Sequence, residues 1–233
     1  EGGMADVYLA KHTTLGKEVA IKVIKPFQNQ HDEMISRFKR EAWLHSKVGR
    51  HENIIELSNY LEENNKHFLL MEYFKSVELK DKIGKQTGPI PFLRALPIFK
   101  QILNGFGHAH SKGFIHRDIK PANILINSSD KIKILDFGIA KQVSIKNKPE
   151  KELFKTEAKD VQIGTAHYMS PEQITVLELS VATDVYSIGI TFYEILSGRL
   201  PFEGNADQVK KKHIFDSPPD PRDFYPDIPQ NVV

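Results

Sequence analysis

The sequence predicts an α+β fold in which a small antiparallel β-sheet with one helix is followed by a larger, mainly helical part. Two observations support this prediction. Apolar residues alternate with a period of two over much of the first third of the chain, as they do in half-buried strands. After Tyr73 they recur at the spacing of amphipathic helices. We therefore expect two lobes, at residues 1–73 and 74–233.

The chain opens with a predicted β-hairpin. Val7 and Leu9 alternate with their neighbours, a turn is expected at residues 15–17, and the segment EVAIKVIK follows. In that segment the period of two places Lys22 and Ala20 on the same face. The sequence thus predicts that Lys22 projects from the second strand of a hairpin.

A helix and two further strands complete the first lobe. Between residues 32 and 48, Ile35, Phe38 and Ala42 recur with a period near 3.6, which predicts an amphipathic helix with Glu41 near its inner edge. Strands are then predicted at about residues 54–61 and 67–71.

The second lobe contains at least two long predicted helices, one around residues 99–106 and one around residues 185–196. Between them, the short apolar pieces NILI and IKIL are bounded by Ser and Asp turn signals and are typical of small strands. The final segment, SPPDPRDFYPDIPQ, is proline-rich and predicted to be irregular.

Composition excludes several classes of protein. The 32 basic and 30 acidic residues are interspersed, so we expect neither nucleic-acid binding nor membrane contact by this part of the protein. The absence of cysteine excludes disulfides, thiolate metal sites and a cysteine nucleophile. No apolar run of about 18 residues occurs, and a cytoplasmic location is expected.

The strongest chemical signal is a pair of motifs in the second lobe. HRDIKPAN brings Asp118, Lys120 and Asn123 into one loop, and DFG places Asp136 only 18 positions after Asp118. Carboxylate and amide oxygens suit Mg²⁺, and a lysine can stabilise phosphate charge. Such convergence is what phosphoryl transfer requires, because that reaction depends mainly on positioning and electrostatic stabilisation.

Together with VAIK, SPE and DVYSIG, these motifs occur in the order typical of one family. The sequence resembles the protein kinase family from residue 1 to about residue 229, and GGMA resembles its bacterial eukaryotic-like Ser/Thr branch. The resemblance implies a bilobal protein kinase fold that uses ATP with Mg²⁺ or Mn²⁺. A lone DFG or HRD would mean little, but an ordered set of five motifs is not expected by chance.

The resemblance also implies roles for the motif residues. Asp118 would accept or orient the proton of the substrate hydroxyl, and Lys120 would contact the γ-phosphate. Asn123 and Asp136 would ligate the metal. Lys22 would hold the α- and β-phosphates and would itself be held by Glu41.

The rest of the nucleotide site is implied in the same way. In the glycine-rich loop, Gly2 matches the second family glycine, Ala5 replaces the third, Gly3 lies between them, and Val7 matches the residue that caps adenine. The segment FLLMEYF resembles the strand that leads into the hinge. The residues implied around the base are Ala20, Met71 as gatekeeper, the backbones of Glu72 and Phe74, and Leu125 as the floor. For Met71 and Leu125, plain core packing is the alternative.

Two positions indicate the substrate. Lys120 and Thr165 match residues of the Ser/Thr class, so protein Ser and Thr hydroxyls are expected as acceptors. Arg117 is placed to pair with a phosphorylated residue of the activation segment, for which Thr156 is the candidate. The alternative is that Thr156 is an ordinary loop residue and that Glu157 or Asp160 supplies the charge. A dimer for trans-autophosphorylation would fit this interpretation.

Four residues have implied structural roles. Asp184 resembles the aspartate that braces the HRD backbone, and Glu172 resembles an acid that pairs with an arginine of a later helix, which is absent from this sequence. Without that arginine we expect Glu172 to lack its partner. His116 and Phe137 would stack with Leu57 and His45 in a column between the lobes.

Two alternative functions are disfavoured by the motifs that the sequence contains. A pseudokinase acting as a nucleotide-binding module would lack Asp118, Lys22 or Asp136, and all three are present. A small-molecule phosphotransferase of the same fold would lack the SPE segment and the GT motif, and both are present.

Overall fold

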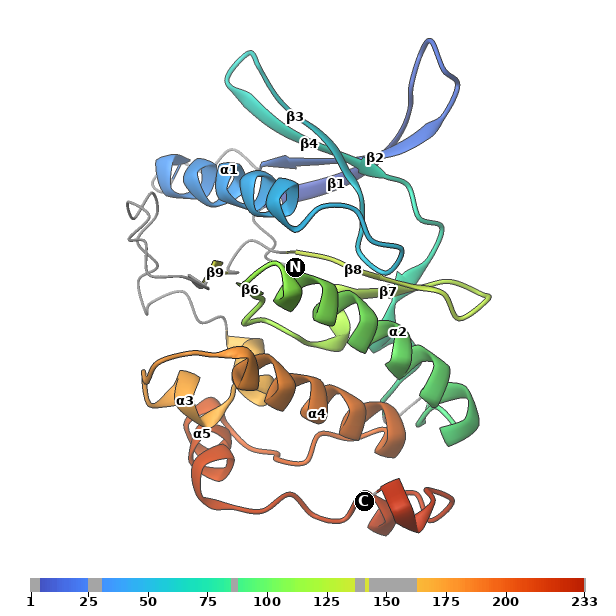
Figure 1. Ribbon diagram of the computed structural model, residues 1–233, viewed down its shortest axis with the longest axis vertical. Coiled ribbons are helices and arrows are strands. Elements are labelled where there is room, and N and C mark those ends of the chain that lie inside the picture. Colours follow the sequence, from blue (N-terminus) through green and yellow to red (C-terminus); the bar gives the residue numbers. More distant parts are fainter. Residues whose placement is uncertain (1–4, 25–30, 85–87, 137–140, 143–162, 233) are drawn as a thin grey trace.

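The computed structural model describes residues 5–24, 31–84, 88–136, 141–142 and 163–232, and it has two parts (Figure 1). At one end lies a four-stranded antiparallel sheet of order β1-β2-β4-β3, accompanied by helix α1 (His31–Val48). Its strands are β1 (Ala5–Lys11), β2 (Glu18–Ile24), β3 (Leu57–Glu63) and β4 (Lys66–Glu72). The other end is mainly helical. This arrangement confirms the α+β bilobal fold, while the exact boundary at residue 73 stays a prediction.

The hairpin of β1 and β2 forms as predicted. The two strands pair in register from Ala5 opposite Ile24 to Lys11 opposite Glu18. Gly16 in the connecting turn has φ of 64°, a left-handed conformation that glycine adopts without steric cost. Lys22 pairs with Leu69 of β4, so its position in the middle of the sheet is fixed from both sides.

Helix α1 joins two hydrophobic cores. Phe38 packs with Ile24 and Leu69 beneath the four-stranded sheet. Near the end of the helix, Leu44 and Val48 belong instead to the larger core of the helical part. The buried face of α1 thus packs against both cores. Glu41 lies between these two contacts, so its position relative to the helical part is fixed.

The predicted strand at residues 54–61 is wrong at its start. Strand β3 begins only at Leu57, because Ile54 and Ile55 are buried in a different place. The Ile55 N–H donates to the Ile134 carbonyl at 3.0 Å, and the Ile134 N–H donates to the Asn53 carbonyl at 2.8 Å. The loop after α1 is thus hydrogen-bonded to the second lobe before the chain returns to the upper sheet.

The helical part is built around α2 (Phe92–Ser111) and α4 (Val181–Ser197), which lie roughly side by side in Figure 1. Phe99 of α2 stacks on Phe192 of α4 with ring centroids 3.8 Å apart. Both long helices were predicted from their spacing. No helix within the described ranges is both long and apolar enough to cross a bilayer.

Shorter elements surround these two helices. The short helices are α3 (Pro171–Ile174) and α5 (Ala206–Phe215), with 3₁₀ turns η1 (Leu79–Lys82), η2 (Pro121–Asn123), η3 (Ile163–Tyr168), η4 (Pro221–Asp223) and η5 (Gln230–Val232). One small sheet consists of β5 (Val77–Glu78), β7 (Ile124–Ile126) and β8 (Ile132–Ile134). A second one pairs β6 (Phe114–Ile115) with β9 (Lys141–Gln142). Strands β7 and β8 confirm the predicted NILI and IKIL strands and lie at the level between the two lobes in Figure 1.

Candidate active site

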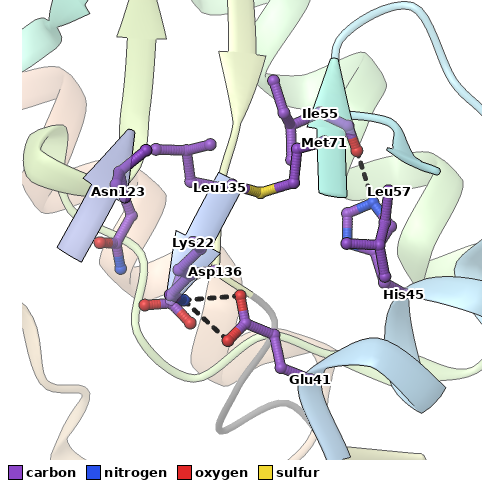
Figure 2. Close-up of a pocket in the computed structure, with 10 residues that line it drawn as sticks. Lys22, Glu41, His45, Ile55, Leu57, Met71, Asn123, Leu135 and Asp136 are labelled. Atoms are coloured by element: carbon purple, nitrogen blue, oxygen red, sulfur yellow. Dashed lines mark hydrogen bonds and ion pairs between the residues drawn. The ribbon is translucent and has the colours of Figure 1, made fainter. Parts of the chain in front are cut away.

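A cavity of about 180 Å³ lies where the upper sheet, α1 and the β7–β8 region meet (Figure 2). Six residues expected at the nucleotide site line it, namely Val7, Lys22, Glu41, Met71, Asn123 and Asp136. The other lining residues within the described ranges are His45, Ile55, Leu57 and Leu135. Charged groups therefore gather at one side of the cavity and apolar groups at the other.

Lys22 of β2 and Glu41 of α1 form an ion pair in this cavity. The Lys22 ammonium donates to both carboxylate oxygens of Glu41, at 2.8 Å and 2.7 Å, as the dashed lines in Figure 2 show. Both side chains are largely buried, with 20% and 12% of their surface exposed. The predicted pairing is present, and it joins the sheet to the helix 19 residues further along the chain.

The electrostatics of this pair involve Asp136 as well. Burial, together with repulsion from Asp136, raises the pKa of Glu41 to about 7, although Lys22 opposes the rise. Burial alone would lower the pKa of Lys22, but attraction to Asp136 and Glu41 outweighs it and raises that pKa. Lys22 is therefore charged at neutral pH, while Glu41 is close to its titration midpoint.

The HRD loop holds its three functional residues together. The Lys120 ammonium donates to Asp118 Oδ1 at 2.9 Å and lies 2.8 Å from Oδ2. The Asn123 amide donates to the Asp118 carbonyl oxygen at 2.8 Å and to its carboxylate at 2.9 Å. Asp118 is thereby fixed in orientation by a cation and an amide from its own loop.

Asp136 and Asn123 line the same cavity, and their donor atoms fit a hard divalent cation. Asn123 uses its amide nitrogen on Asp118, so its carbonyl oxygen is the atom that can serve as a ligand. Asp136 has φ of 59°, a left-handed conformation uncommon for a residue other than glycine. The role of Asn123 and Asp136 as metal ligands stays a prediction.

Asp184 of α4 braces the HRD backbone. It is fully buried, and its carboxylate accepts from the N–H groups of His116 and Arg117 at 2.8 Å each. It also lies 2.7 Å from Nε2 of His110, a partner that was not predicted from the sequence. Arg117 itself has φ of 70°, so these contacts hold it in a strained conformation.

Four of the residues expected around adenine do not line the cavity, namely Ala20, Glu72, Phe74 and Leu125. Ala20 of β2 pairs directly with Met71 of β4. Glu72 is the next residue after Met71 and ends β4. Leu125 lies on β7, opposite Lys133 of β8. The expected base site is thus next to the cavity and shares Val7 and Met71 with its lining.

The structure also shows the contacts of two residues with predicted structural roles, His116 and Glu172. His116 is buried, packs edge-on against Phe106 with centroids 5.3 Å apart, and lies 3.1 Å from the Leu135 carbonyl oxygen through Nε2. Glu172 corrects the expectation that it lacks a partner, because the Thr183 hydroxyl donates to it at 2.8 Å. A hydroxyl donor from the start of α4, that of Thr183, thus takes the place of the expected arginine.

Some predicted residues lie outside the described ranges, namely Gly2, Gly3, Phe137 and Thr156. Thr165 lies in η3, but its side chain is not among those described. Phe74 of the hinge is half-buried, and its carbonyl oxygen accepts a hydrogen bond from Ser76. Ile55 and Leu135 were missed as cavity residues, although Leu135, which directly precedes Asp136, could have been found from that adjacency.

Comparison with known proteins decides the family. The model of the protein kinase domain matches residues 1–227 of this chain. The chain belongs to the protein kinase family. Among curated relatives, this kinase is 38% identical over 232 residues to the serine/threonine-protein kinase PrkC of Bacillus subtilis, covering 99% of the chain and 34% of the relative.

Two further relatives agree. The kinase is 39% identical over 237 residues to the probable serine/threonine-protein kinase PknB of Lactococcus lactis, covering 100% of the chain and 36% of the relative. It is 37% identical over 237 residues to the serine/threonine-protein kinase PknA of Mycobacterium tuberculosis, covering 99% of the chain and 52% of the relative. The chain thus spans about a third of the length of the first two relatives and half of the third.

Proposed function

We propose that this kinase domain transfers the γ-phosphoryl group of ATP to Ser and Thr hydroxyls of proteins. The observation that carries the proposal is the convergence around one cavity of the Lys22–Glu41 ion pair, Asp136 and the Asn123 side chain that also binds Asp118. These groups come from four separate segments of the chain. Their charges match the needs of a reaction in which the protein positions and stabilises a phosphoryl group.

The residues divide the work as follows. Lys22, oriented by Glu41, binds the α- and β-phosphates, and a Mg²⁺ or Mn²⁺ ion held by Asn123 and Asp136 supplies charge neutralisation at the phosphates when bound. Asp118 accepts or orients the proton of the attacking hydroxyl. Lys120, which contacts Asp118, would bind the γ-phosphate during its transfer to that hydroxyl.

We place the adenine base between Ala20 and Leu125, with Met71 at the back and the backbones of Glu72 and Phe74 as hydrogen-bonding partners. Val7, which lines the cavity from β1, covers the base, and Gly2 and Gly3 belong to the phosphate-binding loop. The choice of Ser and Thr as acceptors rests on Lys120, on Thr165 and on the names of the relatives, which are serine/threonine-protein kinases.

We also propose autophosphorylation of the activation segment at Thr156, in trans between two molecules. Arg117 supports this, because its Nε is buried without a hydrogen-bond partner among the described residues. Burial and the nearby charge of Arg40 lower the pKa of Arg117, which marks a concentration of positive charge beside the HRD loop. A phosphate placed there gains charge-assisted hydrogen bonds.

Transfer of ³²P from ATP to a generic protein substrate tests the catalytic proposal, with Asp118→Asn as the variant. We expect a loss of at least about a hundredfold in kcat, because a positioned acid or base contributes that much or more. Asp216→Asn, the same change at an exposed position, is the matched control and should keep the parent rate. Equal rates for Asp118→Asn and the parent would contradict the mechanism, and nucleotide binding without transfer by the parent would favour a pseudokinase.

Phosphopeptide mapping after incubation with ATP tests the modification site. Thr156 should carry phosphate in the active parent, and mixing with an inactive Asp118→Asn molecule should label the inactive partner if the reaction occurs in trans. An active protein with unmodified Thr156 would remove this part of the proposal.

A further inference from the structure

The start of the hinge is held by a contact that the catalytic residues do not use. Glu72 ends β4, and its Oε1 accepts from the Glu56 N–H at 2.7 Å and from the Lys133 ammonium at 2.6 Å. The Glu72 N–H in turn donates to the Glu56 carbonyl at 2.9 Å. We name Glu72, Lys133 and the Glu56 backbone the hinge latch. It joins the hinge to β8 and to the segment before β3.

The latch is well placed to be an effective contact. The side chains of Lys133 and Glu72 are only 16% and 26% exposed, so solvent screens their attraction less than it would at the surface. Lys133 also lies 3.4 Å from the Ile54 carbonyl oxygen, which further fixes its ammonium. Removing one member of a half-buried pair leaves the other charge buried without compensation. This costs more free energy of folding than the same removal in an exposed pair.

Lys133 connects two sides of the expected adenine site. On the antiparallel ladder of β7 and β8 it lies directly opposite Leu125, and residues in such a pair project from the same face of a sheet. The flanking residues Ile124, Ile126, Ile132 and Ile134 are all buried in the core of the helical part. The face that carries Leu125 and Lys133 is therefore the one turned away from that core, and Lys133 extends from it to the hinge.

We propose that Lys133 is a positioning residue for nucleotide binding, acting through Glu72 to fix the hinge backbone against the β7–β8 floor. This rests on the proposed function, in which the backbones of Glu72 and Phe74 bind the base. The latch sets the carbonyl and N–H groups in place before the nucleotide arrives, so that little conformational freedom is lost on binding. Without Lys133, the same backbone must be ordered by the nucleotide itself.

The test compares Lys133→Met, Lys133→Arg and Lys131→Met. Lys131 is exposed, lies two positions earlier at the same hairpin, and therefore provides a matched loss of charge. Titration with a fluorescent ADP analogue and steady-state kinetics should show a Kd for nucleotide and a KM for ATP about five- to tenfold higher in Lys133→Met. The kcat at saturating ATP and the KM for the protein substrate should stay within about twofold of the parent. Lys131→Met should match the parent, and Lys133→Arg should recover most of the affinity.

A double-mutant cycle with Glu72→Gln shows whether Lys133 acts through Glu72. In the Glu72→Gln background, adding Lys133→Met should raise the KM for ATP by less than about twofold, because the carboxylate that Lys133 binds is already gone. An unchanged KM for ATP in Lys133→Met, or a fall in kcat that merely follows a lowered unfolding temperature, would overturn the inference. A parent that neither binds nucleotide nor transfers phosphate would instead contradict the proposed function.

Discussion

Acidification should break the Lys22–Glu41 ion pair in the unliganded enzyme by protonating Glu41. The pKa of Glu41 is about 7, raised from an ordinary value of 4.5 mainly by burial and further by Asp136. The pKa of Lys22 is raised as well, so Lys22 stays charged throughout the range of interest. Protonation of Glu41 is therefore the event that breaks the pair.

The size of the effect follows from that value. With a pKa of about 7, the ionised fraction of Glu41 falls about eightfold between pH 6.5 and pH 5.5, and kcat/KM for ATP should fall by the same factor. Stability should change in the opposite direction. A carboxyl whose pKa is raised on folding stabilises the native state fully below pH 4.5 and loses that contribution as pH rises to about 7. The loss of activity at low pH is thus not expected to come from unfolding.

Measurements of kcat/KM and kcat from pH 5.5 to 8.5 at saturating Mg²⁺ test this reasoning. The kcat/KM profile reports the free enzyme and should bend near pH 7, whereas the kcat profile should bend at lower pH. The shift is expected because a cation beside Asp136 offsets the negative charge that helps to raise the pKa of Glu41. Glu41→Gln should be slower and should lose the bend. If Glu41→Gln keeps the same bend, another group is responsible; His45 is a poor candidate, since burial lowers its pKa.

Four substitutions away from the cavity have predicted effects on the free energy of unfolding, measured by urea denaturation. Asp184→Ala removes the acceptor of two buried N–H groups and should cost about 2–5 kcal/mol and most of the activity. Gly105→Ala places a methyl group against a buried isoleucine of β8 and should cost about 1–3 kcal/mol, whereas Gly107→Ala in the same helix meets nothing within 4 Å and should stabilise by about 0.5–1 kcal/mol. Thr183→Val deprives the half-buried Glu172 of its donor and should cost about 1–2 kcal/mol. Equal effects of the two glycine substitutions would contradict the packing argument. An unchanged free energy of unfolding in Asp184→Ala or Thr183→Val would show that the hydrogen bonds of that residue do not stabilise the fold.

Local patterns were sufficient to predict the elements that carry the cavity's charged residues. The period of two in EVAIKVIK fixed the face of Lys22, and the helical period over residues 32–48 placed Glu41 near the buried side. Both periods reflect contacts with the nearest layer of the fold, which is why the sequence reveals them. Their meeting across 19 residues was implied by the family resemblance and is observed in the structure.

Contacts between distant segments could not be predicted from periodicity. Ile54 and Ile55 have the composition of a strand, but they are buried against β8, about 80 residues later in the chain. Helix α5 was missed because its sequence, ADQVKKKHIF, is mostly polar and buries only Val209 and His213. Its start depends on a capping box made by Asn205 and Gln208, a signal that is weak without a hydrophobic pattern behind it.

The hinge latch illustrates the same limit at the site. Glu72 was expected to matter for its backbone, whereas its side chain joins three segments that are far apart in the chain. A lone Glu and a lone Lys are usually solvated surface residues, so neither position gave a signal. Only the ladder that sets Lys133 opposite Leu125 brings the ammonium to the hinge.

The brace at Asp184 shows how the fold maintains strained residues at the site. Arg117 and Asp136 both have positive φ, a conformation that costs a residue with a side chain about 1–2 kcal/mol. The two N–H groups that Asp184 binds, those of His116 and Arg117, define the backbone of one strained position. Asp184 is fully buried, so breaking these two hydrogen bonds would cost more free energy than Arg117 would gain by relaxing to an unstrained conformation. Asp184→Ala should therefore reduce kcat more than the loss of folded protein explains, since Asp118 directly follows the residue that is released.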